Sequence, residues 1–302
     1  MLGKPRIVIF TDDPGWHAQE LKRAFSSIGR EVEICSLTKC RFDSSRGGLV
    51  IPGFETRLPE GAFVRQIGPG SLEQVVMRLD ILHALAELGV PVYNSPRAIE
   101  RSVDKAMTSF LLHRAGVPTP PFFASEDSPA ARVHFAREAS AGRELVIKPL
   151  FGSMGNGLAR LSGEDEFPDL ALYEGVAYLQ AFIDSGEWHD FRVFVVGGRA
   201  LSAMIRRGLS WINNVAQGGR PERVELDSQL ANIAVRASTA LHMDYAGIDI
   251  VRGHDGGYRV LEVNGIPAWK GLQQVSEIDL AQALADDFVR RGLPRLSLEA
   301  AC

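Results

Sequence analysis

The sequence predicts an α/β fold, with an N-terminal α/β lobe followed by two further α+β lobes. In the first 96 residues, short apolar runs alternate with helical stretches, which is typical of βαβ units. In the C-terminal half, two pairs of strand-like runs meet at glycine-containing turns, which indicates antiparallel hairpins. A chain of 302 residues is also too long for one ordinary core, so several lobes packed together are expected.

The N-terminal lobe is expected to span residues 1–96. Its first strand, RIVIF, is followed by a turn at Asp13-Pro14-Gly15 and by a helix that Gly29 ends. A second strand, EVEICSL, completes a βαβ unit. The rest of the lobe is predicted as a strand at 61–68, a helix at 71–89 and a short strand at 91–94.

The remaining chain is expected to form lobes at 97–178 and 179–292 and a tail at 293–302. A helical segment at 95–116 is ended by prolines, and another helix follows near 130–140. The run ELVIKPL is predicted as a strand that enters a glycine-rich loop. The last elements are predicted as a strand at 176–183, hairpins at 190–207 and 246–264, and a helix at 279–291.

Composition narrows the class of function. An apolar share of 45% and a charged share of 23% are those of a soluble globular protein. The net charge of −4 gives no reason to expect nucleic acid as a partner. The first apolar run is stopped by Asp12 and Asp13, too early for a signal peptide or a membrane span, so a cytoplasmic location is expected. The three cysteines are expected to be free thiols.

Two acidic residues draw attention because they lie within apolar strands. If the second hairpin has a two-residue turn at Asp255-Gly256, then Asp249 lies opposite Glu262 and Gly247 opposite Asn264. Asp249, Glu262 and Asn264 then project from one face of the sheet. An all-oxygen set of this kind suits Mg²⁺, and a three-residue loop would spoil the geometry. The alternative is an ion pair between Glu262 and a base such as Lys270.

A glycine-rich stretch, KPLFGSMGNG, spans residues 148–157. Its glycines allow the backbone to approach a ligand and present N–H groups to phosphate oxygens, although a plain surface turn is the alternative. The lysine precedes the loop, so this is not a Walker A motif. There is also no Gly-x-Gly-x-x-Gly after the first strand, and no Gly-x-Ser-x-Gly in the chain.

Basic residues occur at strand ends or within apolar runs. Each of them alone is more often part of a surface ion pair than of a phosphate site. Together they supply more positive charge than the carboxylates and one metal ion require, and a nucleoside triphosphate would balance them. These residues are Lys105, Lys148, Arg192, Arg206 and Arg207.

The order of the motifs resembles that of ATP-grasp ligases of the RimK-like branch, which add glutamate. The likeness covers residues 65–291 through DKAMTSF, VIKPLFGSMGNG, LQAFI, DFRVFVVG, MIRRG, NNVAQGG, GIDI and LEVNGIP. It implies that the two later lobes clasp ATP between them. Two departures stand out: Ala181 replaces a frequent glutamate, and Arg206 replaces a frequent acid.

The resemblance implies roles for individual residues. Lys105 and Lys148 would reach the phosphates of ATP, and the glycine-rich loop would cover them. Catalytic roles fall to Arg192, Arg207 and Asn214, and Mg²⁺ would be held by Asp249, Glu262 and Asn264, with one or two ions and Mn²⁺ as an alternative metal. The remaining nucleotide contacts would come from Gly152, Ser153, Gly155, Gly157, Gln180, Ala181, Phe182, Ile183 and Asp190.

The resemblance also implies the reaction and its partners. A carboxylate of the acceptor attacks the γ-phosphate of ATP, and an amine then displaces phosphate from the acylphosphate to form an amide. Arg65, Arg206 and Lys270 are candidate substrate residues. L-Glutamate is the expected amine and a small carboxylated molecule the expected acceptor, with a pterin-type cofactor suggested by WKGLQ after LEVNGIP. The alternatives are a protein tail, an amino-acid carrier or a non-catalytic ATP-binding module. A homodimer or tetramer is expected.

Overall fold

The structure is a computed structural model that describes residues 6–152, 155–208, 210–213 and 218–293. The chain divides into two compact units. Unit 1 contains the residues up to Ile99 together with 268–273 and those from Glu277 onward, and unit 2 contains Glu100–Pro267 and 274–276. No helix within the described ranges is both long and apolar enough to cross a membrane.

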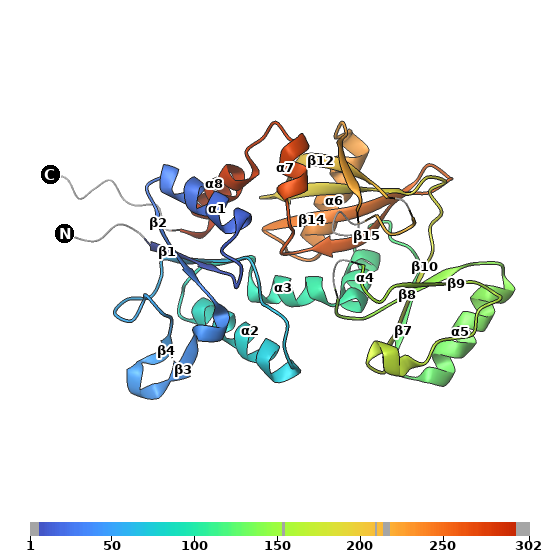
Figure 1. Cartoon of the computed structure of the whole chain (residues 1–302), viewed down its shortest axis with the longest axis horizontal. Helices are drawn as coiled ribbons and strands as arrows, with labels where there is room; N and C mark the ends of the chain where they lie inside the picture. The colour runs from blue at the N-terminus through green and yellow to red at the C-terminus, as the bar shows by residue number, and fades with distance from the viewer. Residues whose placement is uncertain (1–5, 153–154, 209, 214–217, 294–302) are drawn as a thin grey trace. The chain divides into compact units, whose positions relative to one another are not determined.

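Unit 1 is built on a parallel sheet in the order β2-β1-β5-β6. Its strands are β1 (Arg6–Phe10), β2 (Glu31–Cys35), β5 (Gly61–Val64) and β6 (Val92–Tyr93). Figure 1 shows α1 (Trp16–Ser27) and α8 (Leu280–Gly292) on one side of this sheet and α2 (Leu72–Glu87) on the other. A capping box formed by Ser71 and Gln74 begins α2, which satisfies N–H groups that the helix itself leaves unpaired.

The C-terminal helix belongs to unit 1, whereas the sequence placed it in the lobe at 179–292. The reason is aromatic packing. Phe288 of α8 is fully buried, and its ring lies 5.7 Å from that of Phe25, 6.1 Å from Phe63 and 5.2 Å from Tyr93. Burying these rings together outweighs the sequence proximity of α8 to the strands before it.

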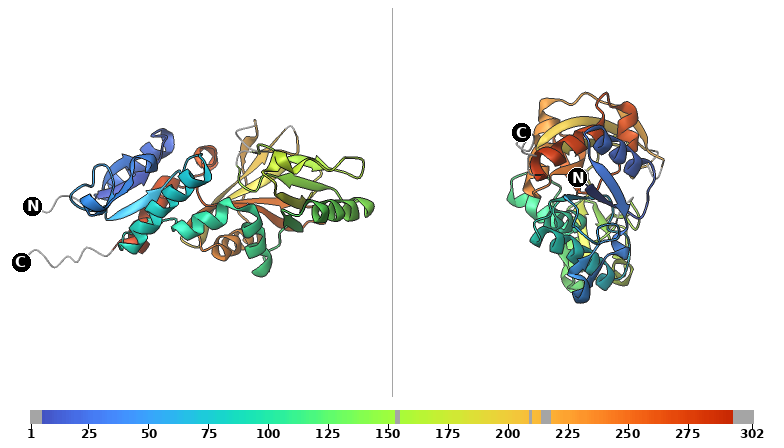
Figure 2. Two further views of the ribbon diagram at one scale, coloured as in Figure 1. Left: turned by 90° about the horizontal axis from the view of Figure 1, so that it is seen from below. Right: turned by 90° about the vertical axis from the view of Figure 1, so that its left-hand side faces the viewer.

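The first part of unit 2 contains an antiparallel sheet in the order β7-β10-β8-β9. Its strands are β7 (Phe122–Ser125), β8 (Leu145–Lys148), β9 (Ala159–Leu161) and β10 (Ala177–Ala181), and α5 (Ser128–Ser140) packs against it (Figure 2). Its core includes Phe135, Ile147 and Leu179. Lys148 is the last residue of β8, and the three residues before it are buried.

The second part of unit 2 contains a five-stranded antiparallel sheet in the order β13-β12-β11-β14-β15. The helix α6 (Ser228–Ala240), which the sequence analysis did not predict, packs against this sheet and begins at the N-cap Asp227. The strands are β11 (His189–Val196), β12 (Arg199–Arg207), β13 (Arg220–Arg223), β14 (Tyr245–Arg252) and β15 (Tyr258–Asn264).

The segment predicted as one helix at 95–116 is two helices, α3 (Pro96–Val103) and α4 (Lys105–Arg114). Asp104 separates them because its side chain accepts a hydrogen bond from the Met107 N–H and so begins a new helix. This cap places Lys105 at the first position of α4. The remaining elements are the small hairpin of β3 (Arg41–Asp43) and β4 (Gly48–Val50), the helix α7 (Lys270–Val275) and short 3₁₀ turns at Leu37–Lys39, Ser44–Arg46 and Leu170–Tyr173.

The hairpin of β14 and β15 has a three-residue loop, so the predicted two-residue turn is wrong. The Gly253 N–H donates to the Gly257 carbonyl at 3.0 Å, which leaves residues 254–256 as the loop. A β-bulge compensates for the extra loop residue, because Ile250 pairs with Val260 whereas Asp249 pairs with Glu262, and Leu261 is left over. The predicted pairs Asp249–Glu262 and Gly247–Asn264 are therefore confirmed.

Candidate active site

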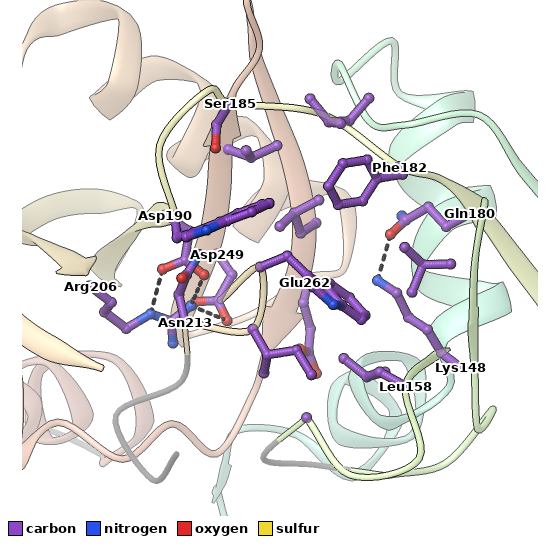
Figure 3. A pocket seen from close by; sticks show the side chains of 18 of the residues that line it. Lys148, Leu158, Gln180, Phe182, Ser185, Asp190, Arg206, Asn213, Asp249 and Glu262 are labelled. Atoms are coloured by element: carbon purple, nitrogen blue, oxygen red, sulfur yellow. Dashed lines mark hydrogen bonds and ion pairs between the residues drawn. The ribbon is translucent and has the colours of Figure 1, made fainter. Parts of the chain in front are cut away.

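A pocket in unit 2 is lined by side chains from both of its sheets (Figure 3). One wall comes from β8 and β10, and the other comes from β11, β12, β14 and β15. The lining includes basic, acidic and aromatic residues. Those predicted from the sequence are Lys105, Lys148, Gly152, Gly155, Gln180, Ala181, Phe182, Ile183, Asp190, Arg206, Asp249 and Glu262.

Lys148 is the basic residue of the first wall. Its Nζ donates to Gln180 Oε1 at 2.6 Å, and the Gln180 Nε2 is buried without a hydrogen-bond partner among the described residues. Burial lowers the pKa of Lys148 to about 8, although Glu262 partly opposes this shift. A buried ammonium group and an unsatisfied amide that both face a pocket are suited to an anionic ligand with hydrogen-bonding groups.

Lys105 lies where the glycine-rich loop begins. Its Nζ donates to the Gly152 carbonyl at 2.8 Å, and burial lowers its pKa while Glu262 opposes the shift. At the other end of the loop, Gly157 has a φ of +71°, and a Cβ there would lie 2.7 Å from Pro149 Cγ. Only glycine fits this backbone without displacing the loop.

The connection after β10 forms another edge of the pocket. The N–H groups of Ala181 and Phe182 donate to the carbonyls of Pro121 and Glu144 at 2.8 and 2.9 Å. The Ile183 N–H makes no such bond among the described residues, although Ile183 lines the pocket. The Phe182 ring lies edge-on to Trp211 and carries the Arg160 guanidinium over its face. A backbone donor beside apolar side chains is suited to a flat heteroaromatic ring.

A buried network of four charged side chains covers one face of the five-stranded sheet. Arg206 donates to both oxygens of Asp190 at 2.6 Å and forms an ion pair with Asp249 Oδ2 at 3.0 Å. Arg192 donates to both oxygens of Asp249 at 2.5 and 2.7 Å. Although burial opposes ionisation, the two guanidinium groups hold the pKa of Asp249 below its usual range.

Glu262 lies next to this network on β15, directly opposite Asp249. Within its own unit, the carboxylate makes no hydrogen bond or ion pair with another described residue, and it faces the pocket. Asn264 does not line the pocket, and its Oδ1 accepts one hydrogen bond from the Ile266 N–H at 3.0 Å. One unengaged carboxylate beside further oxygen donors fits the chemistry of a hard divalent cation.

The structure does not bring every predicted residue to this pocket. Arg207 is partly exposed on the other face of β12, where it pairs with Glu187 and Glu222. Arg65 and Lys270 belong to unit 1 and do not line this pocket. Gly157 also lies outside the lining, and Arg192 reaches the site only through Asp249. Ser153 and Asn214 lie outside the described residues.

Arg206 occupies the pocket because β12 contains a bulge. A regular hairpin about Gly197 and Gly198 would place Arg207 on the face that carries Asp190. Phe194 pairs with Ser202 whereas Val195 pairs with Ala200, so Leu201 is an extra residue and the parity changes. Arg206 consequently lies opposite Asp190.

Among the lining residues that sequence reasoning missed are two tryptophans and an amide, Trp188, Trp211 and Asn213. Their positions give a weak signal, because they flank the strands β11 and β12 rather than lying within a motif. The text WINN at residues 211–214, which ends with the predicted Asn214, was the feature that could have indicated Trp211 and Asn213. Aromatic side chains beside a predicted polar site often line a ligand pocket.

The fold and the pocket together define an ATP-grasp ligase. The solved structure of the ATP-grasp ligase PsnB, complexed with a phosphomimetic variant of its minimal precursor, Mg and ADP, matches with a TM-score of 0.71 at 23% identity. That match covers 96% of this chain and 99% of PsnB. The chain belongs to the RimK-like ATP-grasp family, whose domain model matches residues 102–288.

Two curated relatives are more similar in sequence. The tetrahydromethanopterin:α-L-glutamate ligase of Methanosarcina acetivorans is 36% identical, and the match covers 92% of this chain and 97% of the relative. The tetrahydromethanopterin:α-L-glutamate ligase of Methanococcus maripaludis is 38% identical, with 75% of this chain and 77% of the relative covered.

Proposed function

We propose that the protein is an ATP-dependent α-L-glutamate ligase that joins glutamate to a carboxylate of a tetrahydromethanopterin-type cofactor. The observation that supports this proposal is the pocket of unit 2, which brings two lysines, a backbone donor beside apolar side chains and an unengaged carboxylate together in a fold of the RimK-like family. The pterin acceptor is supported by the two curated relatives, which share more than a third of their aligned residues with this chain.

ATP fits the donors and charges of the pocket. Lys105 and Lys148 would bind the phosphates, because both are ammonium groups whose partial burial lowers their pKa values, and an anion would offset that shift. The Ile183 N–H and the apolar side chains near it would bind the adenine. The loop at 152–157 would then exclude water from the reacting phosphate.

Mg²⁺ fits the oxygen donors on the opposite wall. Glu262 offers a carboxylate without a partner in its unit, Asp249 lies directly across from it, and the amide oxygen of Asn264 retains one free lone pair. When bound, the metal would offset charge on the transferring phosphoryl group. These three residues could hold one ion or two, and they suit Mn²⁺ as well as Mg²⁺.

The side chains of the protein orient the substrates and shield them from water, and they do not form covalent bonds with them. A carboxylate oxygen of the acceptor attacks the γ-phosphorus of ATP, and the bond to the β-phosphate oxygen breaks, which gives ADP and an acylphosphate. The amino group of glutamate attacks the acyl carbon and loses a proton, and inorganic phosphate leaves. Arg206 takes the catalytic role that the sequence had given to Arg207, because Arg206 is the arginine at the pocket. It would stabilise charge near the γ-phosphate.

The direct test is phosphate release from ATP and Mg²⁺ by the purified protein, with L-glutamate and separate acceptors. Pterin cofactors, short acidic peptides and an amino-acid carrier protein form the panel, and mass spectrometry identifies each product. We expect ADP, phosphate and a pterin product heavier by one glutamyl residue. Turnover with only a peptide or a carrier protein would show that this molecule, and not a pterin cofactor, is the acceptor. ATP binding without turnover would favour a non-catalytic ATP-binding module. A cytoplasmic location and assembly into a dimer or tetramer stay predictions.

A further inference from the structure

Arg206 joins the two acidic residues that neighbour each other on β11 and β14. Its guanidinium group crosses β11 and reaches Asp190 and Asp249 at once, and only 3% of the residue is exposed. Figure 3 shows this group between the two carboxylates at one end of the pocket. Arg206 therefore bridges two carboxylates that would otherwise repel each other, and together with Arg192 it balances their charge.

Asp249 Oδ2 lies against both arginines in this arrangement. It accepts a hydrogen bond from Arg192 Nη2 at 2.7 Å and forms an ion pair with Arg206 Nη2 at 3.0 Å, whereas Oδ1 accepts from Arg192 Nε. A cation at Oδ2 would lie beside the positive charge of Arg206, so Oδ2 can bind it without that repulsion only after Arg206 moves away. Arg192 forms a bidentate pair with Asp249 and therefore binds this carboxylate more strongly than Arg206 does.

The charges of the pocket also disfavour a lone divalent cation. Three basic groups of the lining, Lys105, Lys148 and Arg206, lie around three acidic groups, so the lining has no net negative charge to attract a cation. The acidic groups are Asp190, Asp249 and Glu262. A cation alone would meet the positive charge of Arg206 beside Asp249, whereas the phosphates of a nucleotide would be attracted to the basic groups.

We infer that Arg206 is an internal counter-cation that keeps a divalent metal out of the site until nucleotide binds. Arg206 and the metal exclude each other at Asp249 Oδ2. The nucleotide phosphates offer Arg206 a new anionic partner, and its departure removes the positive charge beside Asp249 Oδ2 while Arg192 holds the carboxylate in place. This inference rests on the proposed function and adds an order of binding to it, with nucleotide preceding metal or arriving with it.

The experiment measures Mn²⁺ binding by electron paramagnetic resonance, without nucleotide and with a non-hydrolysable ATP analogue. The wild type is expected to bind Mn²⁺ only with the analogue. Arg206→Met removes the guanidinium group and leaves Asp190 and Asp249 facing each other. We expect it to bind Mn²⁺ without nucleotide at least about tenfold more tightly than the wild type does.

Two variants serve as matched controls. Arg207→Met makes the same change one position along, on the opposite face of β12, and is expected to bind Mn²⁺ as the wild type does. Arg206→Lys keeps the positive charge and is also expected to need nucleotide. A second measurement needs no variant: Mg²⁺ alone should leave the unfolding temperature of the wild type unchanged, whereas Mg²⁺ should raise it further when the analogue is present.

Several results would overturn the inference. They are Mn²⁺ binding by the wild type without nucleotide, no binding by a folded Arg206→Met without nucleotide, or a higher wild-type unfolding temperature with Mg²⁺ alone. If Arg206→Met does not fold, the thermal measurement on the wild type decides. Failure of the proposed function is separate, because it would appear as no binding of the ATP analogue by the wild type with or without metal.

Discussion

At the scale of single residues, His17 in unit 1 acts as a hydrogen-bond acceptor. Its Nε2 accepts from the N–H groups of Trp269 and Lys270 at 3.1 and 3.3 Å, at the start of α7, so the ring must be neutral there. Burial, followed by the positive charge of Arg65, lowers the pKa of His17 from 6.5 to about 4.

The lowered pKa predicts a pH dependence of stability. The unfolded chain binds a proton at His17 below pH 6.5 and the folded chain only near pH 4, so stability falls as the pH drops through this window. Because the ring is partly exposed, we expect a loss on the order of 1 kcal/mol. Urea unfolding at several pH values would measure it. In His17→Gln, whose amide accepts without titrating, this part of the pH dependence should vanish, and an unchanged pH profile would contradict the assignment.

Glu262 provides a second test at this scale. Glu262→Gln keeps the size and one oxygen of the side chain but removes its charge, so it should impair Mg²⁺-dependent turnover far more than folding. We expect kcat to fall at least about tenfold, with a change in unfolding free energy below about 1 kcal/mol. A Mg²⁺ titration of the rate and a urea curve measure the two effects. Equal turnover with an unchanged Mg²⁺ requirement would remove Glu262 from the metal site.

At the scale of elements, the glycine-rich loop depends on its junction with β8. Gly157→Ala would place a methyl group against Pro149 and force an L residue into the left-handed region. We expect about 1 kcal/mol of lost stability and an affinity for ATP lowered about tenfold. Gly142→Ala is the control, because it has a φ of +69° with nothing within 4 Å of the new Cβ. Similar ATP affinities of the two variants would show that the junction does not matter.

How much the sequence could predict depends on these elements. Apolar periodicity and the Gly197-Gly198 turn were sufficient to predict β11 and β12, and the count across the second hairpin was sufficient to place Asp249 opposite Glu262. Bulges are invisible to such counts because one extra residue reverses which face each later side chain occupies. One bulge offset a misjudged loop, and the other exchanged Arg207 for Arg206 at the pocket. The helix α6 was missed because its polar residues obscure the apolar face that its packing reveals.

At the scale of the whole molecule, each unit has its own core, and the pocket lies in unit 2 alone. Phe288→Ala would open the aromatic core of unit 1, and we expect it to cost about 3–5 kcal/mol. Its effect on ATP affinity at a temperature where the protein is folded should be small. Phe42→Ala is the control, because Phe42 in unit 1 is 46% exposed and its loss should cost little. Calorimetry and nucleotide titration measure both quantities, and a similar stability loss in the two variants would contradict this account of the core.

The tryptophans are divided between the same two units. Trp188 and Trp211 line the pocket of unit 2, whereas Trp16 and Trp269 pack with His17 in unit 1. These are all four tryptophans of the chain. Intrinsic tryptophan fluorescence can therefore report on each unit separately. Replacing Trp188 and Trp211 with phenylalanine leaves an emission signal that follows unit 1. Replacing Trp16 and Trp269 instead leaves a signal from the pocket of unit 2 that responds to nucleotide binding.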